Sequence, residues 1–174
     1  VDGGPKAAGP IVSKFATELA IKKARGNGIA LAAARGQAMI LSMYARMAVD
    51  AGMVGIVMNQ SFPTVAPFGG AGPLLGNGTF AYGVPAGRHD PIIFDASLTQ
   101  SSASGMFLAA LQRQKVPPGL LLDEHGMPTI DAIDFPSKSD YRDPDRGPDA
   151  GGSLTALGDS HKGYGLVLMV CLFS

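Results

Sequence analysis

The chain has 174 residues, with 14 basic and 14 acidic side chains and therefore no formal net charge at pH 7. A chain of this length can bury a core of its own, and 46% hydrophobic residues are typical of a folded protein rather than a disordered one. Nucleic acids and anionic membranes are normally bound through basic patches. The balanced charge therefore argues against either of them as the main partner.

The single cysteine, Cys171, cannot form a disulfide within the chain, which favours a reducing, cytoplasmic compartment. The longest apolar run, residues 166–173, is far shorter than the roughly 20 residues that a membrane-spanning helix needs. The chain begins without Met and stops inside this apolar run, so we expect it to be a piece of a longer protein.

The first 59 residues show the periodicity of two helices, each followed by a strand. Residues 10–25 predict a helix whose apolar face would carry Val12, Phe15, Ala16, Leu19, Ala20 and Ala24. The apolar run 29–34 predicts a buried strand, residues 38–51 a second helix and residues 53–59 a second buried strand. This alternation predicts a layered α/β core in which the two strands pair in parallel.

The rest of the chain is richer in Gly and Pro and predicts shorter elements. We expect strands at 80–84 and 91–96, a helix within 101–115, a strand and turn within 120–129, and a polar loop over 135–160.

Three glycines in "GGAGPLLG", Gly70, Gly72 and Gly76, superficially resemble a dinucleotide-binding fingerprint. That fingerprint needs a strand before it and a helix after it, and Pro73 with the preceding prolines allows neither. We interpret the stretch as a structural loop.

The three histidines, His89, His125 and His161, all lie in predicted loops. None is spaced from another His or from Cys as zinc ligands are, so no metal is expected. We interpret His125 as a turn residue and His89 as a solvated one.

Polar side chains gather where the strand 91–96 ends, at Asp95, Ser97 and Thr99. Ligands of layered α/β proteins bind at the carboxyl ends of strands, and hydroxyls beside free helix amides suit a phosphate or a ribose. The alternative is that Asp and Ser side chains simply cap the following helix. The sequence leaves both interpretations open.

Two further polar clusters have the same kind of position. Lys162 stands where an apolar helix begins, and the helix dipole opposes a cation there unless an anionic ligand is present. A solvated surface lysine is the alternative. Asn59, Gln60 and Ser61 follow the strand 53–58. Three such clusters in one small chain indicate a ligand cleft more strongly than any one of them.

Several segments, in this order and spacing, resemble the type-2 malate/lactate dehydrogenase family. This family includes ureidoglycolate, sulfolactate and diketogulonate dehydrogenases and the piperideine-carboxylate reductases. The segments are "VDG", "AIKKARGNGIAL", "YARMAVDAGMVGIVMNQS", "VAPFGGAGPLLG", "FDASLTQSSASG", "PPGLLLDEHGMPTIDA" and "HKGYGLVLMV".

The resemblance implies an α/β fold of the sulfolactate dehydrogenase type, which binds NAD(P) without a Rossmann domain, with a layered, mixed sheet and flanking helices. It also implies a homodimeric oxidoreductase that transfers a hydride between NAD or NADP and a small 2-oxo or 2-hydroxy acid of the malate, lactate or ureidoglycolate type. Residues 1–174 would form a single NAD(P)-binding domain, without the N- and C-terminal parts of the family fold.

Five residues match positions where the family contacts its cofactor. They are Ser61, Asp95, Ala96, Ser97 and Lys162.

The chain departs from the family pattern at Gln37, which aligns with a histidine that many members use in catalysis. A glutamine amide can hydrogen-bond a carbonyl but cannot donate the proton that reduction of a carbonyl requires. A second departure is Gly76–Thr79, where the family usually has "G-T-N-P". The alternative functional hypothesis is thus a non-catalytic relative that binds a nucleotide or metabolite, and a third hypothesis is an unrelated structural module.

Overall fold

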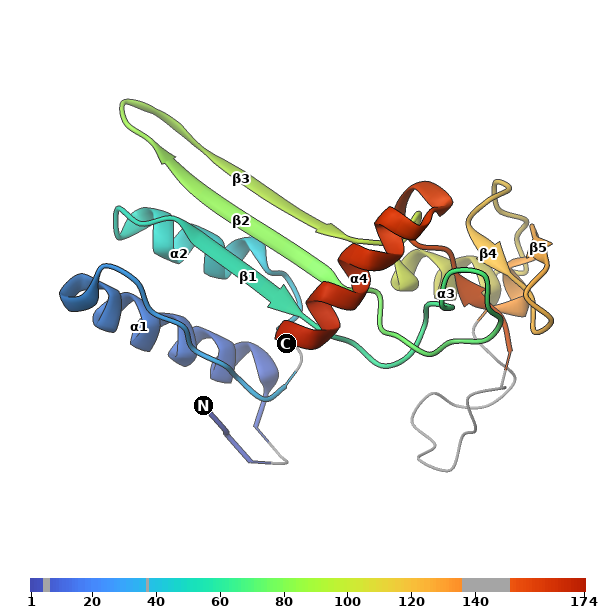
Figure 1. The fold of residues 1–174 in the computed structure, drawn as a ribbon, viewed down its shortest axis with the longest axis horizontal. Helices are drawn as coiled ribbons and strands as arrows, with labels where there is room; N and C mark the ends of the chain where they lie inside the picture. Colours follow the sequence, from blue (N-terminus) through green and yellow to red (C-terminus); the bar gives the residue numbers. More distant parts are fainter. Residues whose placement is uncertain (5–6, 37, 136–150) are drawn as a thin grey trace. The chain divides into compact units, whose positions relative to one another are not determined.

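The computed structural model describes residues 1–4, 7–36, 38–135 and 151–174 (Figure 1). The chain divides into two compact units. Unit 1 comprises residues 1–59, 79–96 and 174, and unit 2 comprises residues 60–78 and 97–173. Two sequence predictions fall on residues outside the described ranges: the catalytic position Gln37, and most of the polar loop, residues 136–150.

Unit 1 contains a three-stranded sheet with two helices (Figure 1). Its elements are α1 (Gly9–Asn27), α2 (Ser42–Asp50), β1 (Gly55–Asn59), β2 (Thr79–Ala86) and β3 (His89–Ser97), whose last residue belongs to unit 2. The strand order is β1-β2-β3, and β1 pairs antiparallel with β2. A two-residue turn, Gly87–Arg88, joins β2 and β3 as a hairpin.

Helix α2 packs closely on β1 and β2 because both strands present a glycine to it. Gly55 and Gly83 are directly opposite each other in the β1–β2 register. A β-carbon on Gly55 would lie 2.7 Å from the Ala48 side chain, and one on Gly83 would lie 2.8 Å from Val49 Cγ2. The absence of these two side chains lets the helix lie against the sheet.

The strand predicted at 29–34 is wrong, and so is the parallel pairing predicted from it. Residues 29–34 form no strand, and the side chains of Ile29 and Leu31 are 83% and 94% exposed. The partner of β1 is instead β2, which pairs with it antiparallel. An apolar run becomes a buried strand only where neighbouring backbone and side chains cover it, and in unit 1 as described only the first two residues of the chain pair with the end of this one.

Both predicted helices of unit 1 exist, with changes. Pro10 lies in the first turn of α1 and Gly28 ends it with φ +80°, as expected of such residues. Val12 and Ala16 are buried, but Phe15, expected on the same face, is 58% exposed. Helix α2 starts at Ser42 rather than at residue 38, because Met39 has φ +69°, which is incompatible with a right-handed helix.

As described, unit 2 contains two α-helices, two short 3-10 helices and a second three-stranded sheet, antiparallel in the order β5-β4-β6. Its elements are α3 (Ala103–Leu111), β4 (Leu121–Leu122), β5 (Pro128–Thr129), the 3-10 helix η1 (Ala132–Asp134), β6 (Ser153–Leu154), the 3-10 helix η2 (Leu157–Asp159) and α4 (His161–Phe173).

The strand and turn predicted within 120–129 are confirmed by β4 and β5, and the helix predicted within 101–115 is confirmed as the shorter α3. Ser102 caps α3, its hydroxyl accepting a hydrogen bond from the Gly105 N–H at 3.1 Å. The polar loop predicted over 135–160 is wrong for residues 153–154, because Ser153 and Leu154 form β6 and are fully buried.

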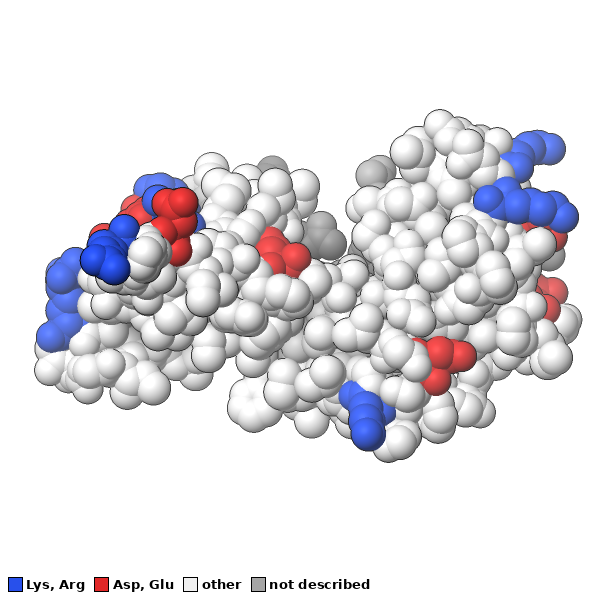
Figure 2. All heavy atoms as spheres, turned by 90° about the horizontal axis from the view of Figure 1, so that it is seen from above, with Lys and Arg blue, Asp and Glu red and all other residues white. Residues whose placement is uncertain are grey.

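Within the described ranges, no helix combines the length and the apolar character needed to cross a membrane. On the face drawn in Figure 2, basic and acidic side chains lie near one another among uncharged residues rather than in a patch of one sign.

Candidate functional site

Asn77 joins two of the segments that carry predicted site residues in unit 2. The Ser61 hydroxyl donates a hydrogen bond to Asn77 Oδ1 at 2.8 Å and accepts one from the Asn77 N–H at 3.1 Å. The Asn77 carbonyl in turn accepts from the Leu98 N–H at 3.1 Å. The segments of Ser61 and Ser97 are therefore neighbours, although 36 positions separate them in the sequence.

The segment after Ser97 is also bonded to the segment that leads into α4. The Gln100 N–H donates to the Thr155 carbonyl at 3.1 Å, and the Leu157 N–H donates to the Leu98 carbonyl at 3.0 Å. Helix α4 begins shortly after this segment and carries Lys162, an exposed residue, in its first turn. The structure thus brings together the segments that carry Ser61, Ser97 and Lys162.

Helix α4 lies against the Gly76–Gly78 segment, where the chain departs from the family pattern. A β-carbon on Gly78, whose φ is +53°, would lie 3.3 Å from Val167 Cα. One on Gly76 would lie 2.5 Å from the Ser61 carbonyl oxygen. The glycines of this segment therefore allow α4 and Ser61 to approach it closely.

Farther along α4, the Cys171 thiol contacts the Gln60 side-chain amide. Burial raises the pKa of the Cys171 thiol, and hydrogen bonds from the Gly76 backbone and from Gln60 offset part of this rise. Because the thiolate is the reactive form, we expect alkylation by iodoacetamide at neutral pH to be slower than in the urea-unfolded chain. The rate, followed by mass spectrometry from neutral pH to about pH 10, should rise with a midpoint above that of a free cysteine. Equal rates for the folded and unfolded chains at neutral pH would contradict this.

Asp95 and Ala96 lie at the end of β3 in unit 1, where Asp95 has a structural partner. Its carboxylate accepts a hydrogen bond from the Ser42 N–H, the first of α2, at 2.7 Å. The residue before the helix, Leu41, supplies no side-chain cap, so Asp95 satisfies an N–H that would otherwise lack a partner. The Ala96 side chain is partly buried. Cofactor contact by this segment stays a prediction.

The residue after Gln37 is held by side chains from two elements of unit 1. The Ala38 N–H donates to Asn59 Oδ1 at 3.3 Å, and the Ala38 carbonyl accepts from the Tyr44 hydroxyl at 2.8 Å. Asn59 ends β1, so this member of the polar strand-end cluster supports the segment that leads into α2.

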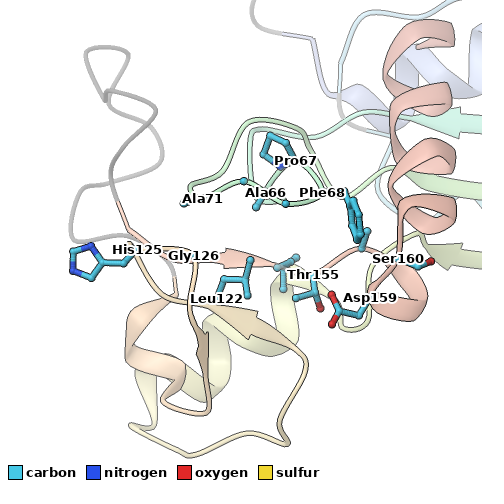
Figure 3. A pocket seen from close by; sticks show the side chains of 14 residues that line it. Ala66, Pro67, Phe68, Ala71, Leu122, His125, Gly126, Thr155, Asp159 and Ser160 are labelled. Carbon is cyan, nitrogen blue, oxygen red and sulfur yellow. The ribbon is translucent and has the colours of Figure 1, made fainter.

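Unit 2 also contains a pocket of about 360 Å³ that no predicted site residue lines (Figure 3). The loop 66–71 forms one wall, and Leu122, Leu154, Thr155 and Ala156 line the pocket across from it. Asp159 and Ser160 complete the end next to α4. Figure 3 shows the Thr155 and Asp159 side chains close together below Phe68, whereas the His125 ring points outward at the opposite end.

The sequence did not predict this pocket, although Asp159 and Ser160 stand directly before the predicted site residue Lys162 and its neighbour His161. The pocket forms from three segments far apart in the chain, residues 66–71, 122–126 and 154–160, and no local sequence pattern predicts that they meet. The aromatic rings of Phe68 and His161 link its rim to α4, with centroids 6.0 Å apart in an edge-on arrangement.

The histidines were expected in loops, and this is wrong for two of them. His89 is the first residue of β3 and His161 the first residue of α4. His125 does lie in a turn, where its N–H donates to Asp123 Oδ1 at 2.9 Å. Backbone hydrogen bonds from Met127 and His125 lower the pKa of Asp123. Within the part of the chain that the structure describes, no three His, Cys, Asp or Glu residues gather as a metal site would require.

A family model described as malate/L-lactate dehydrogenase matches residues 1–174. The chain belongs to this family.

Two curated members of the malate/L-lactate dehydrogenase family illustrate the match. The L-sulfolactate dehydrogenase of Methanothermobacter thermautotrophicus is 34% identical over 165 residues, which cover 93% of this chain and 43% of that protein. The ureidoglycolate dehydrogenase (NAD(+)) of Escherichia coli K12 is 31% identical over 170 residues, which cover 97% of this chain and 44% of that protein. The chain therefore spans less than half the length of these relatives.

Solved structures agree with this assignment. A dehydrogenase from Sinorhizobium meliloti matches with a TM-score of 0.83 and 31% identity, over 99% of this chain and 47% of that one. The sulfolactate dehydrogenase from Methanocaldococcus jannaschii matches with a TM-score of 0.75 and 28% identity, over 99% and 46%. The fold is thus the mixed α/β fold of these dehydrogenases, with antiparallel sheets and helices in the part described here.

Proposed function

We propose that this chain is part of an oxidoreductase that transfers a hydride between NAD(P)H and a small 2-oxo or 2-hydroxy acid. The observation that carries the proposal is the meeting of three segments in unit 2. The segments of Ser61, Ser97 and Lys162 match cofactor-contacting positions of the family. Hydrogen bonds join Ser61 to Asn77, Asn77 to Leu98, and Leu98 to Leu157, which lies in η2 just before α4. Family members such as the malate dehydrogenase of Pyrococcus abyssi are named for reactions of this kind.

The residues at the start of α4 suit the phosphates of such a cofactor. The first turn holds no acidic residue, and Lys162 is exposed there at the helix N-terminus, whose partial positive charge favours a bound phosphate. Bound NAD(P)H would supply the hydride. Lys162 would hold the pyrophosphate, and the hydroxyls of Ser61 and Ser97 would bind polar groups of the cofactor. Cofactor contact by Asp95 and Ala96 is proposed from their match to family positions alone.

Two further parts of the proposal come from family membership. We propose that the whole protein is a homodimer and that residues 1–174 act as one NAD(P)-binding domain. The reduced substrate also needs a proton, which the amide of Gln37 cannot donate, although it can orient a carbonyl or stabilise its developing charge.

We expect Lys162→Met to raise the Kd for NADH about 10- to 100-fold, since a hydrogen bond to a charged group is worth about 1.5–3 kcal/mol. Fluorescence titration of the full-length protein measures this, and Lys23→Met, an exposed lysine on α1, is the matched control. An unchanged Kd would contradict the proposal that Lys162 binds the cofactor. If neither NADH nor NADPH binds to the unmodified protein at millimolar concentration, the oxidoreductase proposal fails.

The second candidate function is a non-catalytic relative that binds a nucleotide or metabolite. Gln37 favours it, because a glutamine replaces the residue that many family members use in catalysis. The replacement of Gln37 by histidine, described in the Discussion, separates the two candidates.

A further inference from the structure

We propose that the pocket of unit 2 binds the adenosine half of the dinucleotide and that Asp159 makes the protein prefer NAD to NADP. This inference rests on the proposed function and adds to it the place of one half of the cofactor and the choice between the two cofactors. The pocket volume, about 360 Å³, is near the lower end of the roughly 300–1,000 Å³ typical of ligand sites. It suits a nucleoside rather than a whole dinucleotide.

The walls of the pocket suit a flat heterocyclic base. Phe68 stands on one side with 56% of its surface exposed, so its ring is available for stacking. Leu122, Leu154 and Ala156 line the pocket across from its loop. An aromatic face opposite an aliphatic surface is a common way to bind a base without reading its hydrogen-bonding edge.

Asp159 supplies the chemistry that a ribose requires. It lines the pocket, its side chain is exposed, and among the described residues no ion pair or side-chain hydrogen bond engages its carboxylate. Its φ of +43° is unusual for a residue other than glycine, and such a conformation is often kept for function. An ionised carboxylate only accepts hydrogen bonds, so it pairs with the 2′- and 3′-hydroxyls of a ribose and repels a 2′-phosphate.

The position of Asp159 also agrees with the proposed phosphate site. Asp159 and Ser160 line the pocket, and Lys162 follows in the first turn of α4. The Ser160 hydroxyl accepts from the Gly163 N–H at 3.5 Å, so this residue belongs both to the pocket and to the start of the helix. Base, ribose and phosphate would then follow one another from Phe68 past Asp159 to Lys162, in the order of their bonds in the cofactor.

The test is a fluorescence titration of the full-length protein with NADH and with NADPH, before and after Asp159→Asn. Asparagine has nearly the same shape and tolerates a positive φ, so the exchange removes the charge and leaves the backbone conformation accessible. We expect unmodified protein to bind NADH more tightly. The variant should bind NADH about 10-fold more weakly and NADPH no more weakly, so that the ratio of the two Kd values changes by about 10-fold or more. Asp131→Asn, outside the pocket, should leave the ratio unchanged.

A second measurement separates the pocket from the rest of the cofactor site. ADP-ribose should compete with NADH, and its Kd should rise in Asp159→Asn. The Kd of nicotinamide mononucleotide should be the same in the variant and in the unmodified protein. A ratio that stays the same in Asp159→Asn, or tighter binding of NADPH by the unmodified protein, overturns the inference and leaves the proposed function standing. Absence of binding of both dinucleotides overturns the proposed function and the inference together.

Discussion

Replacing Gln37 by histidine is expected to raise kcat by about 10²- to 10⁴-fold, the usual value of a positioned general acid. Hydride transfer to a carbonyl carbon leaves an alkoxide. An imidazolium, whose usual pKa is about 6.5, can protonate this alkoxide, whereas a primary amide cannot. The measurement is steady-state NADH oxidation by the full-length protein with a panel of 2-oxo acids. The histidine variant should also gain a pH dependence on the acid side of neutrality that the glutamine protein lacks.

Gln37→Asn is the matched control, because it changes the length of the side chain and keeps the amide; kcat should not rise. Turnover that is absent both before and after the histidine exchange, with NADH still bound, would favour the non-catalytic relative. A glutamine protein that already turns over as fast as its histidine variant would mean that another group donates the proton.

Gly163→Ala is expected to cost about 3 kcal/mol of folding free energy, the upper part of the range for overpacking a buried site. Gly163 is buried in the first turn of α4, and a β-carbon there would overlap the Leu157 carbonyl oxygen and lie 2.7 Å from its carbonyl carbon. Backbone cannot rotate away as a flexible side chain can. Thermal unfolding should show a fall in Tm of about 10 °C for a protein of this size.

Gly165→Ala, two residues farther along the same helix, is the matched control. A β-carbon there would have no neighbour within 4 Å, and alanine is favoured over glycine inside a helix by about 0.5–1 kcal/mol. We therefore expect a small rise in Tm. A fall in both variants would show that the helix tolerates no side chain in this turn. No change in Gly163→Ala would mean that α4 does not lie on Leu157 as described.

The sequence predicted secondary structure correctly where the residues of a segment themselves determine its conformation. The helix predicted at 10–25 is present as α1, and the strands predicted at 80–84 and 91–96 are present as β2 and β3. Residues 29–34 show the opposite case. Their composition suits a strand, but a strand also requires a partner, and the sequence does not say whether one is present.

Long-range pairing explains the other errors. Alternating helices and strands predicted parallel pairing, yet the partner of β1 is β2, and the intervening residues 60–78 belong to unit 2. For the site, the local sequence was enough to predict that Ser61 follows a strand and that Lys162 begins a helix. The bridging role of Asn77 was not predictable in this way, because it depends on the meeting of three segments distant in the chain.

The two facing glycines of the first sheet have a consequence for how this chain can vary. Gly55 and Gly83 share one limited volume with the α2 residues that lie on them, Ala45, Ala48 and Val49. A larger side chain at any of these positions must be accompanied by a smaller one opposite or by movement of the helix, and a glycine cannot be made smaller. We therefore expect these five positions to change together among homologues, and single-site libraries to find almost no tolerated replacement at either glycine.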